Sequence, residues 1–79
     1  MIKKLFIGGI PPQATYTEFN EYFRQFGELE DVLLSMKQDG SGANNGFGFV
    51  TYVKAEDANK VLMHPKDHTI RAKWVSLQD

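Results

Sequence analysis

Three phenylalanines, Phe6, Phe47 and Phe49, stand in two runs whose alternating pattern is typical of β-strands. In each run the phenylalanine has the opposite parity to the aliphatic residues beside it, such as Leu5 or Val50. Side chains of opposite parity face opposite sides of a strand. The aliphatic set therefore suits a core, and the phenylalanines suit an exposed face. Rings gathered on such a face could stack against other flat groups, and every nucleobase offers one.

The sequence gives weaker indications of other kinds of site, such as a catalytic, metal-binding or phosphate-binding site. The chain has no cysteine, which excludes disulfides, thiolate metal sites and thiol nucleophiles. His64 and His68 are separated by Pro65, which interrupts a helix, and no third ligand is near in sequence. The glycine-rich segment 40–46 lacks the Lys-Ser or Lys-Thr pair and the following helix of a phosphate loop. We therefore expect no catalytic residue, no metal and no cofactor.

The elements that would position the phenylalanines follow from periodicity and from end signals. Thr15 and Glu18 have capping-box spacing, and Gly27 stands where a left-handed C-terminal cap is expected. Alternation and helical spacing predict, in chain order, strand Lys3–Ile10, a helix from Thr15 to Phe26, strands Asp31–Lys37 and Phe47–Val53, helix Ala55–Met63 and strand Thr69–Val75.

This order, β-α-β-β-α-β, predicts an α+β fold of the ferredoxin-like sandwich type. We expect a four-stranded antiparallel sheet with two helices on one face, which leaves the other face open. In the second strand, Val32, Leu34 and Met36 are expected to share one face. The 79 residues suit a single domain over 1–79, and no apolar run reaches the roughly 20 residues of a membrane span.

Two segments resemble the signature motifs of the RNA recognition motif (RRM) family. Residues 45–52, Asn-Gly-Phe-Gly-Phe-Val-Thr-Tyr, resemble its RNP1 motif, and residues 5–10, Leu-Phe-Ile-Gly-Gly-Ile, resemble its RNP2 motif. Within the family the chain is most similar to the heterogeneous nuclear ribonucleoprotein A/B and Musashi-type domains. The resemblance implies binding of single-stranded RNA on the open sheet face. The RNA-binding residues that it implies are Lys4, Phe6, Leu33, Phe47, Phe49, Arg71, Lys73 and Val75; of these Leu33, like Asp31 on the same strand, is a weaker assignment.

The charge distribution departs from that of a strongly basic nucleic-acid binder. The net charge is −1 and the sequence pI is about 6.1. Asn45 stands where RNP1 usually has a basic residue, which removes one expected phosphate contact. Parity places Lys4, Arg71 and Lys73 on the open face, so this face can be mildly positive although the whole chain is acidic.

Single-stranded RNA is the expected partner, and single-stranded DNA, other RRM domains and protein partners stay open. The main alternative is a protein–protein interaction module that uses the same fold. An acylphosphatase-like enzyme is not expected, because the two arginines, Arg24 and Arg71, lie in a helix and in the final strand. We also expect a monomeric domain, no membrane association, and an intracellular location in the nucleus, the cytoplasm or both.

Overall fold

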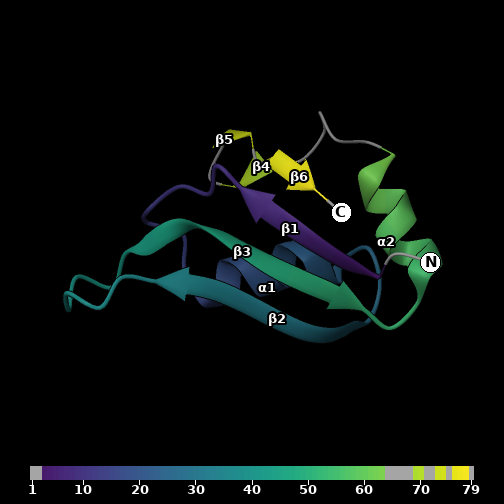
Figure 1. Ribbon diagram of the computed structural model, residues 1–79, viewed down its shortest axis with the longest axis horizontal. Coiled ribbons are helices and arrows are strands. Elements are labelled where there is room, and N and C mark those ends of the chain that lie inside the picture. Colours follow the sequence, from purple (N-terminus) through teal and green to yellow (C-terminus); the bar gives the residue numbers. More distant parts are fainter. Residues whose placement is uncertain (1–2, 64–68, 71–72, 75, 79) are drawn as a thin grey trace.

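A computed structural model shows an antiparallel sheet with two helices (Figure 1). It describes residues 3–63, 69–70, 73–74 and 76–78, and the side chains of 3–63. The elements are β1 (Lys4–Gly8), α1 (Tyr16–Arg24), β2 (Leu29–Met36), β3 (Asn44–Tyr52), α2 (Ala55–Leu62), β4 (Thr69–Ile70), β5 (Lys73–Trp74) and β6 (Ser76–Gln78). No helix of the described part is long and apolar enough to cross a membrane.

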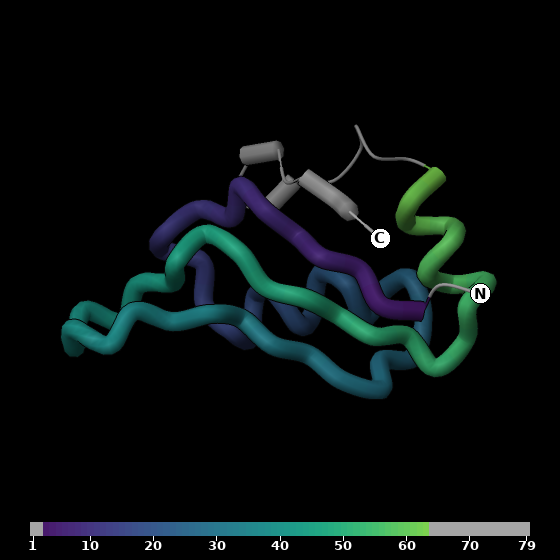
Figure 2. The backbone as a smooth tube through the Cα atoms, viewed as in Figure 1, coloured from purple at the N-terminus to yellow at the C-terminus, as the bar shows by residue number. Residues whose placement is uncertain are grey.

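The sheet has the strand order β2-β3-β1-β6, with β3 and β1 at its centre. Figure 2 shows the backbone of β3 running between those of β2 and β1. The predicted last strand, Thr69–Val75, is wrong. Thr69–Ile70 pairs with Lys73–Trp74 in a separate two-stranded sheet, and Ser76–Gln78 pairs with β1 instead. An alternating apolar pattern fits either arrangement, so periodicity could not identify the pairing partner.

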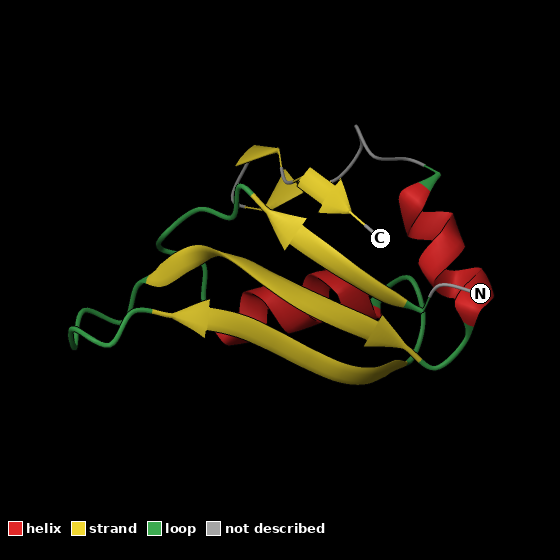
Figure 3. Cartoon of the chain, in the orientation of Figure 1, coloured by secondary structure: helices red, strands yellow, loops and turns green. Residues whose placement is uncertain are grey.

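One apolar core holds the helices against one side of the sheet. Figure 3 shows α1 running behind the strands. The inward residues of β1 and β3 are at most 1% exposed, and they pack with buried residues of both helices. The α+β class, with two helices and an antiparallel sheet, is confirmed. The main members of this core are Leu5, Ile7, Phe19, Phe23, Val50, Tyr52, Ala58 and Val61.

Helix α1 begins as predicted and ends differently. Thr15 accepts a hydrogen bond from the Glu18 backbone N–H, and the Glu18 carboxylate accepts one from the Thr15 backbone N–H, which completes a capping box. The predicted left-handed cap at Gly27 is wrong, because Gln25 caps the helix in the right-handed conformation. Gly27 is required for a different reason: a Cβ there would overlap the side chain of Asp57 at the start of α2.

Met36, expected on the same face of β2 as Val32 and Leu34, is the last residue of that strand. Leu34 is 7% exposed, whereas Met36 is 38% exposed. The pairing with β3 shifts register between these two residues: Leu34 lies opposite Gly48 and Met36 lies opposite Asn44, so the extra residues are on β3.

The first residue of β3, Asn44, connects the sheet to the loop that precedes α1. Its side chain is 1% exposed. Its Nδ2 atom donates to the carbonyl oxygens of Pro11 at 2.7 Å and Ala14 at 3.0 Å. Its Oδ1 atom accepts from the backbone N–H of Gly46 at 2.7 Å. Asn44 therefore fixes the segment that leads into Phe47 against the β1–α1 loop.

We predict that Asn44→Ala lowers the free energy of unfolding by ~2–4 kcal/mol, because it leaves three backbone groups without their side-chain partner. Chemical denaturation measures the change. The matched control is Asn45→Ala, whose side chain is exposed and donates one hydrogen bond, to Ser35 Oγ at 2.9 Å. This control should cost less than about 1 kcal/mol. Equal losses for the two variants would contradict the role assigned to Asn44.

Candidate nucleic-acid interface

The pairing of the central strands brings the three phenylalanines to one face. In the antiparallel register Phe6 lies opposite Phe49, and Gly8 lies opposite Phe47. On the other side of β3, Leu33 of β2 also lies opposite Phe49. A row across three strands therefore consists of Leu33, Phe49 and Phe6. Phe47 occupies the next position on the same face of β3, opposite Gly8.

These side chains are turned away from the core. Phe47 is 55% exposed, Phe6 48% and Leu33 44%, and Phe49 is partly buried. The ring centroids of Phe6 and Phe49 are 6.1 Å apart with an interplanar angle of 61°, which is an edge-on contact. The surface is thus an apolar aromatic patch that folding does not cover.

Lys4 adds a positive charge to this patch. Its Nζ atom lies 4.0 Å from the ring centroid of Phe49 and 5.3 Å from that of Phe6. Both distances are within the range of a cation–π interaction. The ammonium group therefore lies over the aromatic pair.

Gly48 allows β2 and β3 to approach each other between the exposed phenylalanines. A Cβ at this position would overlap the carbonyl oxygen of Leu33. Glycine is thus required between Phe47 and Phe49 for close backbone approach. The same close pairing places Leu33 beside Phe49.

Five of the predicted RNA-binding residues lie together on this face. Lys4, Phe6, Leu33, Phe47 and Phe49 come from the three adjacent strands β1, β2 and β3.

The remaining three predicted residues belong to the C-terminal segment. Arg71 and Val75 lie outside the described residues. Lys73 is in β5, which pairs with β4 rather than with β1. The strand beside β1 is β6, in which Gln78 lies opposite Phe6. Lys73 is therefore not part of the four-stranded sheet in which the predicted strand Thr69–Val75 placed it.

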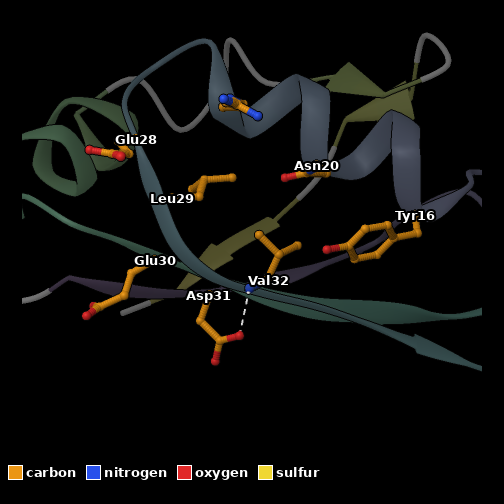
Figure 4. A pocket seen from close by; sticks show the side chains of 8 residues that line it. Tyr16, Asn20, Glu28, Leu29, Glu30, Asp31 and Val32 are labelled. Atoms are coloured by element: carbon orange, nitrogen blue, oxygen red, sulfur yellow. Dashed lines mark hydrogen bonds between the residues drawn. The ribbon is translucent and has the colours of Figure 1, made fainter.

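A bulge in β2 places two neighbouring carboxylates on the open side, which the alternation did not predict. The register against β3 shifts between Leu29 and Asp31, so Glu30 is an extra residue in the strand. Leu29 and Val32 point toward α1, whereas Glu30 and Asp31 point to the opposite side of the strand (Figure 4). Asp31 lies opposite Thr51, which lies opposite Lys4. The end of the face near Lys4 therefore also carries negative charge.

On the helix side, a polar hollow of about 370 Å³ lies between α1 and β2. Tyr16, Asn20 and Arg24, spaced one helical turn apart on α1, line it, and Figure 4 shows Tyr16 and Asn20 on the helix. Among the described residues, no group of three or more His, Asp or Glu side chains could hold a metal ion.

Comparison with protein families and known proteins agrees with this geometry. A family model described as RNA recognition motif matches residues 5–71. The chain is 37% identical over 96% of its length to heterogeneous nuclear ribonucleoprotein 1 of Arabidopsis thaliana, and it covers 18% of that protein. It is 39% identical over 89% of its length to nuclear polyadenylated RNA-binding protein 4 of Saccharomyces cerevisiae, and it covers 14% of that protein. The chain thus spans less than a fifth of either relative.

Solved structures show the same fold. A structure of the Rna15 RRM with bound RNA (GU) superposes with a TM-score of 0.87 at 12% identity, covering 99% of this chain and 82% of the other. The crystal structure of RNA binding protein PG1 superposes with a TM-score of 0.81 at 16% identity, covering 96% of this chain and 90% of the other. At these identities the likeness concerns the fold alone.

Proposed function

The chain belongs to the RNA recognition motif family, and from this we propose that its open sheet face binds single-stranded RNA. The observation that supports the proposal most strongly is the exposed aromatic patch of Phe6, Phe47 and Phe49 on paired central strands. Bases stack on these rings, and Leu33 and Lys4 contact the same nucleotides from the neighbouring strands. Arg71, Lys73 and Val75 are proposed as further contacts because of the family resemblance.

Stacking explains why the ligand is single-stranded. A base must leave its own stack to lie flat on a phenyl ring, and paired bases within a duplex do not present a free face to a sheet. At the uncharged end of the patch, Phe47 lies opposite Gly8. Because glycine has no side chain, there is room for a base beside the Phe47 ring. The modest charge of the face implies that stacking contributes more to affinity than phosphate contacts.

We predict that Phe47→Ala weakens binding to a pool of short labelled single-stranded RNAs by about tenfold or more, since one stacked base is worth roughly 1–3 kcal/mol. Fluorescence anisotropy measures the affinity. Tyr16→Ala is the matched control, because Tyr16 is a similarly exposed aromatic residue (50%) on α1, on the helix side. Unchanged binding by Phe47→Ala would contradict the proposal, and so would an equal loss in Tyr16→Ala.

The segment that resembles RNP1 begins with the uncharged Asn45 in place of the usual basic residue. Asn45 is exposed at the end of the patch near Phe47 and is hydrogen-bonded to Ser35. Asn45→Lys should raise RNA affinity and steepen the dependence of log K on log salt by about 0.7, the contribution of one phosphate contact to a single strand. Titrations at four salt concentrations measure the slope. An unchanged slope would show that no phosphate passes this position.

The biological setting is also a proposal. We propose that residues 1–79 act as one RNA-binding domain, without enzymatic activity, within a ribonucleoprotein or another RNA-regulatory protein of the nucleus or cytoplasm. The names of the two relatives support this, since one is a ribonucleoprotein and the other an RNA-binding protein, and both names include the word nuclear. Single-stranded DNA and neighbouring RRM domains are secondary candidate partners.

A protein-interaction module is the second candidate function. The hollow between α1 and β2 is the observation in its favour. We place it second because Leu29 and Val32, which point toward the helix, are already packed against the core. This leaves less apolar surface there than on the aromatic patch.

A further inference from the structure

The sequence contains a single asparagine–glycine pair, Asn45-Gly46, and the pair lies in β3 just before Phe47. Asparagine is a thermolabile residue. The backbone nitrogen of the next residue can attack its side-chain carbonyl carbon, and a following glycine leaves that nitrogen unshielded because it has no Cβ. Asn45 is exposed, so water reaches the pair. The pair is therefore a candidate site of chemical modification within the interface.

Side-chain hydrogen bonds hold both reacting groups in the folded domain. The attacking group, the Gly46 backbone N–H, donates to Asn44 Oδ1 at 2.7 Å. The carboxamide of Asn45 is held through Nδ2, which donates to Ser35 Oγ at 2.9 Å. Cyclisation requires the N–H to lose its proton and the carboxamide to turn toward the nitrogen. Both hydrogen bonds must therefore open before the reaction can occur.

The chain also has an Asp-Gly pair, Asp39-Gly40, which is a poorer site for the same cyclisation. The Ser41 hydroxyl and backbone N–H donate to the Asp39 carboxylate at 2.6 Å and 3.0 Å. These hydrogen bonds, that of the hydroxyl first, lower the pKa of Asp39. An ionised carboxylate resists attack by a nucleophile, whereas the neutral carboxamide of Asn45 does not carry this protection.

We propose that Asn45 deamidates in the folded domain at a rate limited by its neighbours Asn44 and Ser35, and that the products weaken RNA binding. The Gly46 nitrogen forms a bond to the Asn45 side-chain carbonyl carbon, and the bond from that carbon to the amide nitrogen breaks. Ammonia leaves with the proton that the Gly46 N–H gives up. Water then opens the succinimide ring at either carbonyl, which yields an aspartyl or an isoaspartyl residue. The net reaction consumes water, releases ammonia and involves no oxidation or reduction.

Both products alter the interface beside Phe47. The aspartyl product places a negative charge where the RNP1 motif usually has a basic residue, so it repels a nearby phosphate. The isoaspartyl product routes the main chain through the former side chain. This adds an atom to the main chain before Phe47 and disturbs the alternation that turns its ring outward. The effect on binding rests on the proposed RNA-binding function, whereas the reaction itself does not.

The first test incubates the purified domain without RNA at mildly alkaline pH and follows each asparagine by peptide mapping with mass spectrometry. Deamidation replaces an NH group by oxygen, so the mass separates it from isomerisation at Asp39, which changes no mass. Asn45 should convert before Asn59, which is also exposed but precedes a lysine in α2. Equal conversion of Asn45 and Asn59 would overturn the inference.

Ser35→Ala tests the restraint, because it removes the partner of the Asn45 carboxamide and leaves Asn44 intact. Conversion of Asn45 should become about fivefold faster, the change expected from the loss of one hydrogen bond. The rate at Asn59 should stay constant, since it reports unfolding of the whole domain. Ser41→Ala is the matched control, because its hydroxyl bonds to Asp39 instead. An unchanged rate in Ser35→Ala, or an equal acceleration in Ser41→Ala, would overturn the role of the hydrogen bonds.

The second test compares RNA binding before and after incubation. Incubation should weaken binding by the wild-type domain and not by Asn45→Gln, whose longer side chain would have to close a larger ring. Asn45→Asp should weaken binding about fivefold at low salt, the effect of one like charge about 4 Å from a phosphate in water. The loss should shrink as salt rises.

The outcomes separate the inference from the proposed function. Wild-type binding that survives complete conversion of Asn45, while Phe47→Ala still weakens it, would overturn the inference alone. Failure of the freshly purified wild-type domain to bind any RNA would overturn the proposed function and the effect on binding together. Conversion at Asn45 would then still be decided by the mass measurement, which contains no RNA.

Discussion

The register between β1 and β3 is the constraint on which the rest of the structure depends. It places Phe6 opposite Phe49 on one face and Leu5 opposite Val50 on the other. A slip of one residue would exchange the faces, burying the phenylalanines and exposing the core. Hydrogen bonds hold both ends of β3: Asn44 joins one end to the β1–α1 loop, and the Tyr52 hydroxyl donates to the Phe23 carbonyl of α1 at 2.6 Å. Burial raises the pKa of Tyr52, which keeps this hydroxyl protonated as a donor.

Residue parity predicted the central part of the interface because burial enforces it. Leu5 and Val50 have no solvent exposure, so their neighbours along regular strands must face outward. The same argument placed Phe6, Phe47 and Phe49 together, and the capping box placed the start of α1. These features depend on local spacing and on one buried face, both of which can be read from a sequence.

Features that depend on an irregular backbone or on pairing over a long distance could not be predicted. The bulge at Glu30 puts two consecutive carboxylates on one side, and a second register shift lies between Leu34 and the exposed Met36. Gly27 is needed for contact with Asp57, thirty positions away, rather than for a left-handed cap. The partner of β1 at the sheet edge is β6, although alternation predicted Thr69–Val75 as the last strand. The position of Lys4 over Phe49 is likewise a property of the folded face.

The central claim is that RNA binds the aromatic face of the sheet. Its most direct test is an NMR titration of the labelled domain with short single-stranded RNA, following backbone amides and phenylalanine ring signals together. We expect the largest shifts at Phe6, Phe47 and Phe49, with smaller shifts at Lys4 and Leu33. Signals from the wall of α1 at Tyr16, Asn20 and Arg24 should stay in place. Shifts confined to α1 and the adjoining hollow, with the phenylalanine rings unaffected, would contradict it.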